Sequence, residues 1–487
     1  MNTFIARVRA SLKLYTPWDA PPEIYPLRKK GAIFFLGLAI IYLSLQIGQH
    51  LVVQKAYWVA DSVDYILPAK NITIAKLFSW PYAKFWGAAV LYHLTGTSPE
   101  NIDLLQALIS AVAWLSLAWV FSRSIQAPFL KIIGFAVIIG FSLTNQVEIW
   151  NHVILSESLS ISLMILAMAL WLSLIQRWNR AVWIALLLTL VYWINTRETN
   201  LYLCLLIAVG IFLLGLIRRN QRFYWSISCI IIFVSLNLLR NSEQLTMPRW
   251  AFSLTNVILQ RILPQPEYVD FFAEHGMPVN SELRALQGQW AYSHDFAVFN
   301  NSAFNRFEHW LYANGEKTYI LFLLTHPKYI LLSPLQNWVA MMADANFVRD
   351  YVPNYRQLLP NLLDSLLFPI QWFGVYSWLC LALIAGGIFI RVWKFTRAFW
   401  LVVALMILWI PHIFLVWHAD AMEIPRHAIQ ANIQFRLSMW MFGLLAADAL
   451  TLRFMYRRGR DMKDIVRSVG RRPHAKESRA QQVILCR

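Results

Sequence analysis

The chain has 487 residues, of which 58% are hydrophobic and 14% are charged. A soluble domain is roughly 45–50% apolar and about 25% charged, and its surface needs more charge than this chain supplies. The composition excludes a disordered chain and argues against an ordinary soluble enzyme. The four cysteines show neither a disulfide framework nor a metal-ligand spacing.

The composition instead predicts an all-α, polytopic bundle of transmembrane helices. Residues 1–30 precede the first apolar run, which argues against a cleavable signal peptide. Within them, Phe4, Val8 and Leu12 recur at helical spacing beside basic residues, which is typical of an amphipathic helix on the cytoplasmic membrane surface.

Apolar runs recur along the rest of the chain. A helix needs about 20 apolar residues to cross a bilayer. We expect about ten spans, at 31–53, 102–122, 129–146, 157–176, 181–196, 199–217, 223–240, 366–390, 399–417 and 430–452. The fifth and sixth runs are short, so they also fit one re-entrant pair.

The net charge of +17 follows this topology. With a cytoplasmic N-terminus, every short cytoplasmic loop is basic, and well over half of the 43 Lys and Arg residues face the cytoplasm. Such segments attract anionic lipid headgroups. We therefore expect membrane lipids as partners and no nucleic acid, with both termini cytoplasmic. The chain shows no retention signal, so we expect a bacterial inner membrane.

Two long segments fall on the external side. The first external loop, 51–101, contains aromatic, amphipathic stretches that predict helices lying in the membrane interface. The second, 241–365, has aromatic residues at helical spacing and predicts an external, mostly helical cap region. The expected organisation is an N-terminal segment, a transmembrane core, this cap, C-terminal transmembrane helices and a basic tail, at 1–30, 31–240, 241–365, 366–452 and 453–487.

Ionisable residues at membrane depth are costly and usually functional, and four groups of charged residues stand out on the external side. The first contains Asp61, Asp64 and Tyr65, shortly after the first span. A partly desolvated carboxylate there suits a general base, and it equally suits the cap of the next helix.

The second group is Glu148 with Glu157 at the mouth of the fourth span. Glu157 fits the first turn of a helix, where the dipole favours an acid, and it also fits a ligand of a cation or an acceptor. The third group is Arg197 beside Glu198. This arginine forms a structural ion pair with its neighbour or faces an anionic phosphate.

The fourth group lies at 418–427 and includes Glu423, Arg426 and His427. Its spacing matches no metal motif, and an arginine that clamps phosphate is the better interpretation of Arg426. Arg436 lies deeper in the last span, where it needs a partner or a wet cavity. The chain has no Walker loop, no dinucleotide fingerprint and no Gly-x-Ser-x-Gly elbow.

Several short motifs resemble the GT-C superfamily of membrane glycosyltransferases, in its protein O-mannosyltransferase-like and lipid A aminoarabinose transferase-like branch. They are the Asp-Ser-x-x-Tyr setting of Asp61, "YHLTGTSPENIDLLQAL" before the second span, "ILSESLSISLMIL" at the fourth, and the late Glu-x-x-Arg of Glu423–Arg426. The resemblance covers most of the chain. The family's usual Asp-Glu pair is here Asp61-Ser62, so Asp64 is the substitute for the second carboxylate.

The resemblance implies an inverting transfer of a sugar from a polyprenyl-phosphate donor to a hydroxyl of a lipid, glycan or protein acceptor. Asp61 matches the catalytic base, and Arg197 and Arg426 are the candidates that bind the donor phosphate. The other polar residues of these groups would assist, bind the acceptor or ligate a metal: Asp64, Tyr65, Glu148, Glu157, Glu423 and His427. Some relatives use a divalent cation and others do not.

Two alternatives remain at this point. O-antigen polymerases and ligases also combine many spans with a large external loop, but they lack the early Asp followed by interfacial helices. A lipid or solute transporter would place ionisable residues at mid-bilayer, often on broken and repeated segments, whereas here the charges lie at one interface.

Overall fold

The computed structural model describes residues 29–73, 84–218, 249–343, 346–371 and 396–470, together with Leu381. Within these ranges the chain is helical, and its only β-type pairing is an isolated parallel bridge between Tyr57 and Val153. The all-α class is therefore confirmed. The predicted amphipathic helix before residue 29, the run 223–240, most of the run 366–390 and the tail after 470 lie outside the described residues.

Several long apolar helices indicate a membrane protein. Five described helices are long and apolar enough to cross a bilayer: α2 (Lys29–Val53), α6 (Pro99–Ser122), α9 (Glu157–Gln176), α23 (Arg397–Ala419) and the part of α24 (Ile424–Gly470) up to Phe454. A sixth candidate is the bent pair of α7 (Pro128–Ser142) with α8 (Asn145–Glu148) and η2 (Ile149–His152). The described part of the chain thus supports five or six of the ten predicted spans.

Two predicted spans differ in the structure. The run 181–196 forms α10 (Arg180–Ile194), whose 15 residues fall short of the roughly 20 that a span needs. It is followed by α11 (Glu198–Arg218). The run 129–146 does not form one straight helix, because α7 ends at Ser142 and the chain bends by 56°.

The bend after α7 is accompanied by two local hydrogen bonds and by one from a distant segment. The hydroxyls of Ser142 and Thr144 donate to the carbonyls of Ile139 and Phe141 at 2.7 Å, and such bonds compete with the continuation of a helix. Asp364, from α21 (Asn361–Leu367), then accepts a hydrogen bond from the backbone N–H of Asn145 at 2.7 Å. The new short helix therefore begins with a capped N–H group.

Side chains cap other helices at their first turn. Ser98 accepts from the backbone N–H of Asn101 just before α6, with Pro99 at the first helical position. Thr396 accepts from the N–H of Phe399 at 3.1 Å and begins α23. Hydroxyl residues and proline favour these positions because they satisfy or remove N–H groups that lack a partner within the helix.

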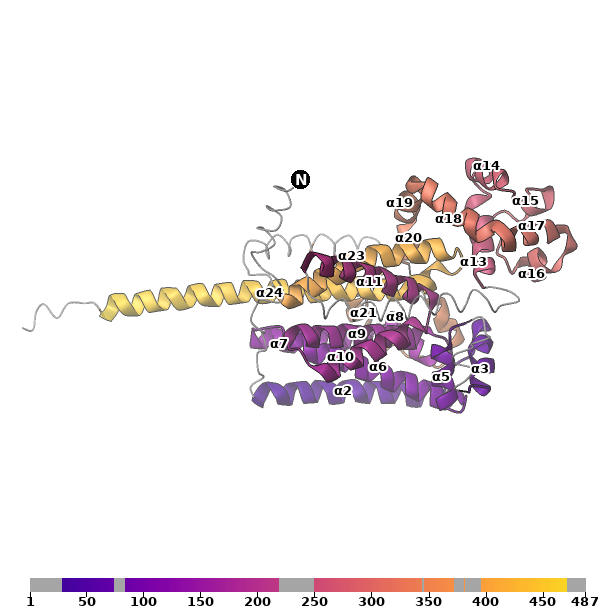
Figure 1. The fold of residues 1–487 in the computed structure, drawn as a ribbon. Helices are drawn as coiled ribbons and strands as arrows, with labels where there is room; N and C mark the ends of the chain where they lie inside the picture. Colours follow the sequence, from indigo (N-terminus) through magenta and orange to yellow (C-terminus); the bar gives the residue numbers. More distant parts are fainter. Residues whose placement is uncertain are drawn as a thin grey trace, which may run out of the picture.

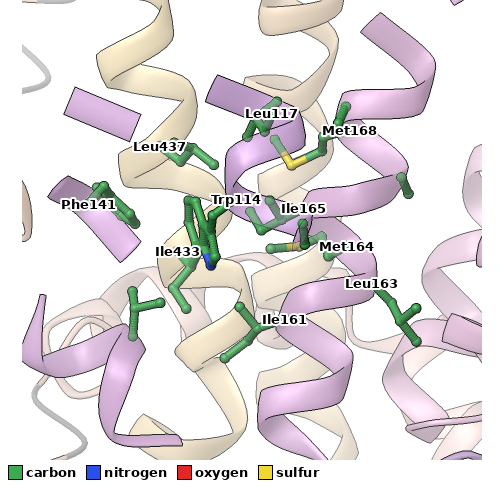
Figure 2. Packing of buried hydrophobic residues seen from close by; sticks show 14 of the residues in the cluster. Trp114, Leu117, Phe141, Ile161, Leu163, Met164, Ile165, Met168, Ile433 and Leu437 are labelled. Carbon is green, nitrogen blue, oxygen red and sulfur yellow. The ribbon is translucent and has the colours of Figure 1, made fainter. Parts of the chain in front are cut away.

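Helix α9 lies at the centre of the bundle. In its apolar 18-residue stretch 78% of the residues are buried, against 17% in α2 and 28% in α23. Figure 2 shows Met164 and Met168 of α9 on one side of Trp114 of α6, and Phe141 of α7 and Ile433 of α24 on its other side. Lipid tails are as apolar as these side chains, so close packing rather than exclusion of water stabilises such a bundle.

A second group of shorter helices follows residue 249 and gathers at one end of the bundle (Figure 1). It has its own core around Phe272, Leu311 and Phe322. Its members are α13 (Arg249–Val257), η3 (Ile258–Ile262), α14 (Pro266–Glu274), α15 (Ser281–Ala285), α16 (Ser293–Asn300), η4 (Ser302–Phe304), α17 (Asn305–Trp310), η5 (Leu311–Gly315), α18 (Glu316–Thr325) and α19 (Pro327–Gln336). The helical character predicted for this region holds for the residues described, and its place as an external cap stays a prediction.

Short helices from the first loop lie at the same end of the bundle, namely η1 (Ala60–Ser62), α3 (Val63–Lys70) and α5 (Trp86–Leu94) (Figure 1). Two more, α20 (Trp338–Met341) and η6 (Asn346–Tyr351), lead back toward the bundle. At the opposite end, α24 runs far beyond the other helices (Figure 1). The first half of the predicted tail therefore continues this helix to Gly470.

Candidate functional site

Arg426 contacts three carboxylates that come from three different parts of the chain. Its Nη2 lies 2.8 Å from Oδ2 of Asp61, its Nε lies 2.8 Å from Oε1 of Glu157, and its Nη1 lies 2.6 Å from Oε2 of Glu423. The Arg426 side chain is only 8% exposed. Charge-assisted bonds of this kind are short and strong, and a buried guanidinium needs them because its desolvation is costly.

The ends of three elements place these groups together. Asp61 lies in η1, Glu157 is the first residue of α9, and Arg426 lies in the first turn of α24. Glu423 precedes α24 with a φ of 46°, in the left-handed region that residues other than glycine adopt rarely. Strain of this kind clusters at functional sites. The predicted first-turn position of Glu157 is confirmed.

Lys84 is a site residue that the sequence did not reveal. Its Nζ lies 3.0 Å from Oδ2 of Asp61 and 3.2 Å from Oδ2 of Asp64, and the side chain is 4% exposed. The same ammonium lies 4.6 Å from the ring centroid of Tyr65, a cation–π distance. The available signal was a lysine directly before Phe85 in an aromatic stretch predicted for the interface.

Arg197, in the turn between α10 and α11, contacts Glu157, which also binds Arg426. Its Nη1 lies 3.3 Å from Oε1 of Glu157, and its Nη2 lies 3.1 Å from Nδ1 of His427. Because arginine only donates, Nδ1 of His427 accepts this bond. Among the ion pairs of the described residues, Arg197 therefore pairs across the site rather than with its neighbour Glu198.

Glu157 and the cations Lys84, Arg197 and Arg426 line a small cleft with a volume of about 60 Å³, and Asp61 reaches it through its contacts with Lys84 and Arg426. The cleft lies between the loop helices, the start of α9, the α10–α11 turn, α13 and the start of α24. Its lining residues are Tyr65, Lys84, Phe85, Ser156, Glu157, Thr196, Arg197, Glu198, Thr199, Ser253, Ala419, Asp420, Arg426 and His427.

Backbone pairing joins the Asp61 loop to the Glu157 loop. The N–H of Tyr57 donates to the carbonyl of His152 at 2.8 Å, and the N–H of Ile154 donates to the carbonyl of Tyr57 at 3.0 Å. Ser62, next to Asp61, donates from Oγ to the carbonyl of Ile154 at 2.8 Å. The distance between the two acidic loops is therefore set by hydrogen bonds as well as by the ion pairs through Arg426.

A close backbone approach positions the turn that carries Arg197. The N–H of Gly87 in α5 donates to the carbonyl of Asn195 at 2.7 Å. A Cβ at Gly87 would lie 2.5 Å from that same oxygen. Only glycine permits this contact, because it has no side chain.

Glu148 belongs to a different cluster, which corrects its predicted grouping with Glu157. Its Oε1 lies 2.6 Å from Nε2 of His152, whose Nδ1 lies 2.6 Å from Oδ1 of Asp103. The other oxygen of Asp103 lies 2.5 Å from Nδ1 of His50. Glu148, His152 and Asp103 are all buried. This chain of acids and imidazoles holds the segment before Glu157 against α6 and α2.

The predicted cation ligands do not form a metal site. Within the described ranges, no group of three or more His, Cys, Asp or Glu residues could hold a metal ion. Asp64 instead contacts Lys84, Glu157 contacts the two arginines, and Glu148 contacts His152. The donor set does not fit the divalent cation that some relatives of the resembled family use.

The loop before α24 is tied to the second group of helices. Asp420 accepts hydrogen bonds from Oγ of Ser253 at 2.8 Å and from Nδ2 of Asn256 at 3.2 Å. Arg261 donates to the carbonyl of Asp420 at 3.0 Å. Helix α13 therefore contacts the loop that leads directly to Arg426.

Arg436 has the partner that its depth required. It is buried, donates from Nε to the carbonyl of Pro369 at 2.9 Å, and lies 4.3 Å from the ring centroid of Phe368. These contacts fasten the chain after α21 to α24. Arg436 is thus assigned a packing role, away from the cleft residues.

Comparison with models of known protein families finds no match, and comparison with curated protein sequences finds none either. The chemistry of the cleft is therefore the basis on which its function is interpreted.

Proposed function

We propose that the chain is an inverting glycosyltransferase that uses a polyprenyl-phosphate sugar as its donor and Asp61 as its base. The observation that supports this proposal is an ion-pair network at one end of an apolar helix bundle. In it Asp61 pairs with Lys84 and Arg426, and Glu157 joins Arg426 to Arg197. Such a site suits a substrate with a lipid tail in the membrane and a phosphate at its surface.

The proposed reaction needs one carboxylate base and a stabilised leaving group. Asp61 takes the proton of an acceptor hydroxyl while that oxygen forms a bond to the anomeric carbon. The bond from that carbon to the phosphate oxygen breaks, and the electron pair leaves with the polyprenyl phosphate. Attack opposite the leaving group inverts the anomeric centre without a carboxylate nucleophile.

The cations suit the leaving phosphate. Guanidinium groups match phosphate geometry and keep their charge. Glu157 is 1% exposed and contacts both Arg197 and Arg426, so it holds the two guanidiniums near each other before a donor arrives. Cationic groups that are already positioned where negative charge develops stabilise the transition state most effectively.

Donor binding in this proposal also releases the base. The cleft has a volume of about 60 Å³, and the arginines that line it already pair with carboxylates. In this proposal a sugar phosphate displaces a carboxylate from a cation, and Arg426, which lines the cleft and pairs with Asp61, is that cation. Exchange of Asp61 for phosphate at Arg426 leaves Asp61 able to accept the proton of the acceptor.

The cluster of His50, Asp103, His152 and Glu148 favours chemistry at the membrane interface over transport through the bundle. His50 lies three residues before the end of α2, and Asp103 lies four residues after the start of α6. Both belong to helix ends rather than to the mid-bilayer depth expected of a transport path. A polymerase or ligase would also place its site at this end of the bundle. The assay below distinguishes that alternative from the proposed transferase.

The decisive experiment compares Asp61→Asn with Asp64→Asn in reconstituted membranes. Both side chains contact Lys84, and only Asp61 also contacts Arg426. The substrates are labelled polyprenyl-phosphate sugars, and the readout is the free lipid phosphate. We expect the rate of lipid phosphate release to be about 10²–10⁴-fold lower for D61N than for the wild type, the usual contribution of a general base. The rate of D64N should fall far less. A D61N protein that is folded and keeps its rate would assign Asp61 a structural role and favour the polymerase or ligase.

A further inference from the structure

The short helices after residue 249 differ in what they expose. Helices α14 and α15 expose charged side chains, namely Glu267, Asp270, Glu274, Glu282 and Arg284. Helices α18 and α19 belong to the same group, but beyond their charged first turns they expose aliphatic side chains. Helices of one water-surrounded domain should all expose polar faces, so the two sets face different surroundings.

The exposed aliphatic residues form a stripe on each helix. On α18 they are Ile320, Leu321 and Leu324, and on α19 they are Leu331, Leu332 and Leu335. The spacing is i, i+1 and i+4 in both helices, which places each set on one face. Their exposure ranges from 40% to 74%, so none of them belongs to the core of the group.

The charge pattern agrees with an apolar environment. Residues 329–343 contain no Asp, Glu, Lys or Arg. The charged residues of the two helices are the exposed Glu316, Lys317 and Lys328, all in the first turns. Large apolar patches on soluble surfaces are rare and mark contact with a partner or a membrane, and lysines beside such a face suit anionic headgroups.

Contacts with α23 place α19 at the end of a candidate span. Trp417 donates from Nε1 to Oγ of Ser333 at 2.9 Å, and Nε2 of His418 lies 3.1 Å from the carbonyl of Ile330. Figure 1 shows α19 and α20 next to the ends of α23 and α24, and α19 contacts α23. The end of a spanning helix is where the bilayer meets water, and tryptophan is enriched at that level.

We propose that α18 and α19 lie in the membrane interface, with the two aliphatic stripes in the lipid leaflet next to the cleft. The partner is the phospholipid bilayer itself. Burial of the six side chains in lipid removes them from water, which is favourable by roughly 25 cal/mol per Å² of apolar surface. The stripes lie on helices at the end of α23, which α19 contacts, and the proposal does not depend on which reaction the cleft performs.

The first test labels the full-length protein in liposomes with a photoreactive lipid whose carbene forms in the acyl region. Trypsin then separates the two stripes into the peptides Thr318–Lys328 and Tyr329–Arg349, while α14 falls in the peptide Ile262–Arg284. We expect label in the first two peptides at several times the level in the third. Equal labelling of all three, or label confined to the third, would overturn the proposal.

A second measurement reads single positions. A variant with its four natural cysteines replaced receives one spin-labelled cysteine at Leu324 or Leu335, or at the control positions Asp270 or Glu282, which are exposed and charged. In the bilayer we expect the leucine positions to collide more with oxygen and the controls more with a water-soluble nickel chelate. Preference for the chelate at Leu324 and Leu335 would show a water-facing surface, and protection from both reagents would show a protein partner instead of lipid. Either result contradicts the proposal.

Discussion

Asp61 and Arg426 lie 365 positions apart in the sequence, and their Oδ2 and Nη2 atoms are 2.8 Å apart in the structure. Arg426 also contacts Glu157 and Glu423, so one guanidinium joins the first loop, the start of α9 and the start of α24. A planar fork of five donors can satisfy three carboxylates at once, and an ammonium group cannot do so with the same geometry.

The first prediction follows from that geometry. Arg426→Lys keeps the charge but loses the fork, so at least one of the three carboxylates loses its direct bond. We expect the release of polyprenyl phosphate to fall by about 10²–10³-fold, the usual effect of removing one electrostatic donor from a reaction site. The matched control is Arg284→Lys on the exposed face of α15. If R426K released polyprenyl phosphate as fast as the control, Arg426 would have no role in the proposed reaction.

The second prediction concerns Glu157, which is buried against Arg197 and Arg426. Glu157→Gln leaves two guanidiniums with less compensating charge in a site that water barely reaches. We expect a loss of about 3–5 kcal/mol in the free energy of unfolding, as for other broken buried pairs. Thermal unfolding in detergent, followed by the loss of monodisperse protein, measures it.

The exposed Glu274→Gln on α14 is the control for this variant, since surface changes usually stay within about 0.5 kcal/mol. Because the proposed site binds phosphate, a polyprenyl phosphate should restore part of the stability that E157Q loses. Equal unfolding temperatures for E157Q and E274Q would show that the ion pairs contribute little.

The third prediction concerns the approach of α5 to the turn before Arg197. Gly87→Ala would place a Cβ 2.5 Å from the carbonyl of Asn195, so α5 and the turn must separate. We expect a loss of about 1–3 kcal/mol in stability, as for other overpacked sites, together with a lower rate, because the turn carries Arg197.

Gly48→Ala is the matched control for this variant, because a Cβ at Gly48 in α2 meets nothing within 4 Å. Alanine favours a helix over glycine, so this change should be neutral or slightly stabilising. If both glycine variants behave alike in unfolding and in rate, the close approach at Gly87 has no consequence for the site.

The fourth prediction is a dependence on pH at Asp364. Burial raises the pKa of this carboxyl above its ordinary value, against the opposing effects of the Asn145 N–H and of Arg349. A carboxyl with a raised pKa in the folded state binds its proton more tightly there than in the unfolded chain. Its ionisation therefore weakens the fold in full above the folded pKa; the penalty shrinks as the pH falls below that pKa and is gone below the pKa of the unfolded chain.

Asp364→Asn removes this ionisation and keeps an oxygen that can accept from Asn145. We expect the variant to match or exceed the unfolding temperature of the wild type near neutral pH, and the difference to shrink as the pH falls below the folded pKa. Unfolding curves at several pH values measure it. A difference that grows on acidification would contradict the assigned direction.

Local sequence determined a large part of the fold. Helix class and five of the described candidate spans follow from apolar runs, because the bilayer requires such runs and allows only internally bonded backbone. The starts of α6 and α23 follow from Ser98 with Pro99 and from Thr396, because capping depends on residues within one turn. The scarcity of charge in the chain is by itself enough to indicate Asp61, Glu157, Arg197 and Arg426 as candidate site residues.

Which charged residues meet was decided only by the tertiary structure. Arg197 pairs with Glu157 rather than with adjacent Glu198, Lys84 joins Asp61 from a separate segment, and Glu148 belongs with His152. The bend after Ser142 depends on a cap from Asp364, more than 200 residues later. The local sequence pattern indicates which charged side chains need a partner, since burying an unpaired charge is costly. The choice among partners depends on how distant helix ends pack, and no periodicity within one segment contains that information.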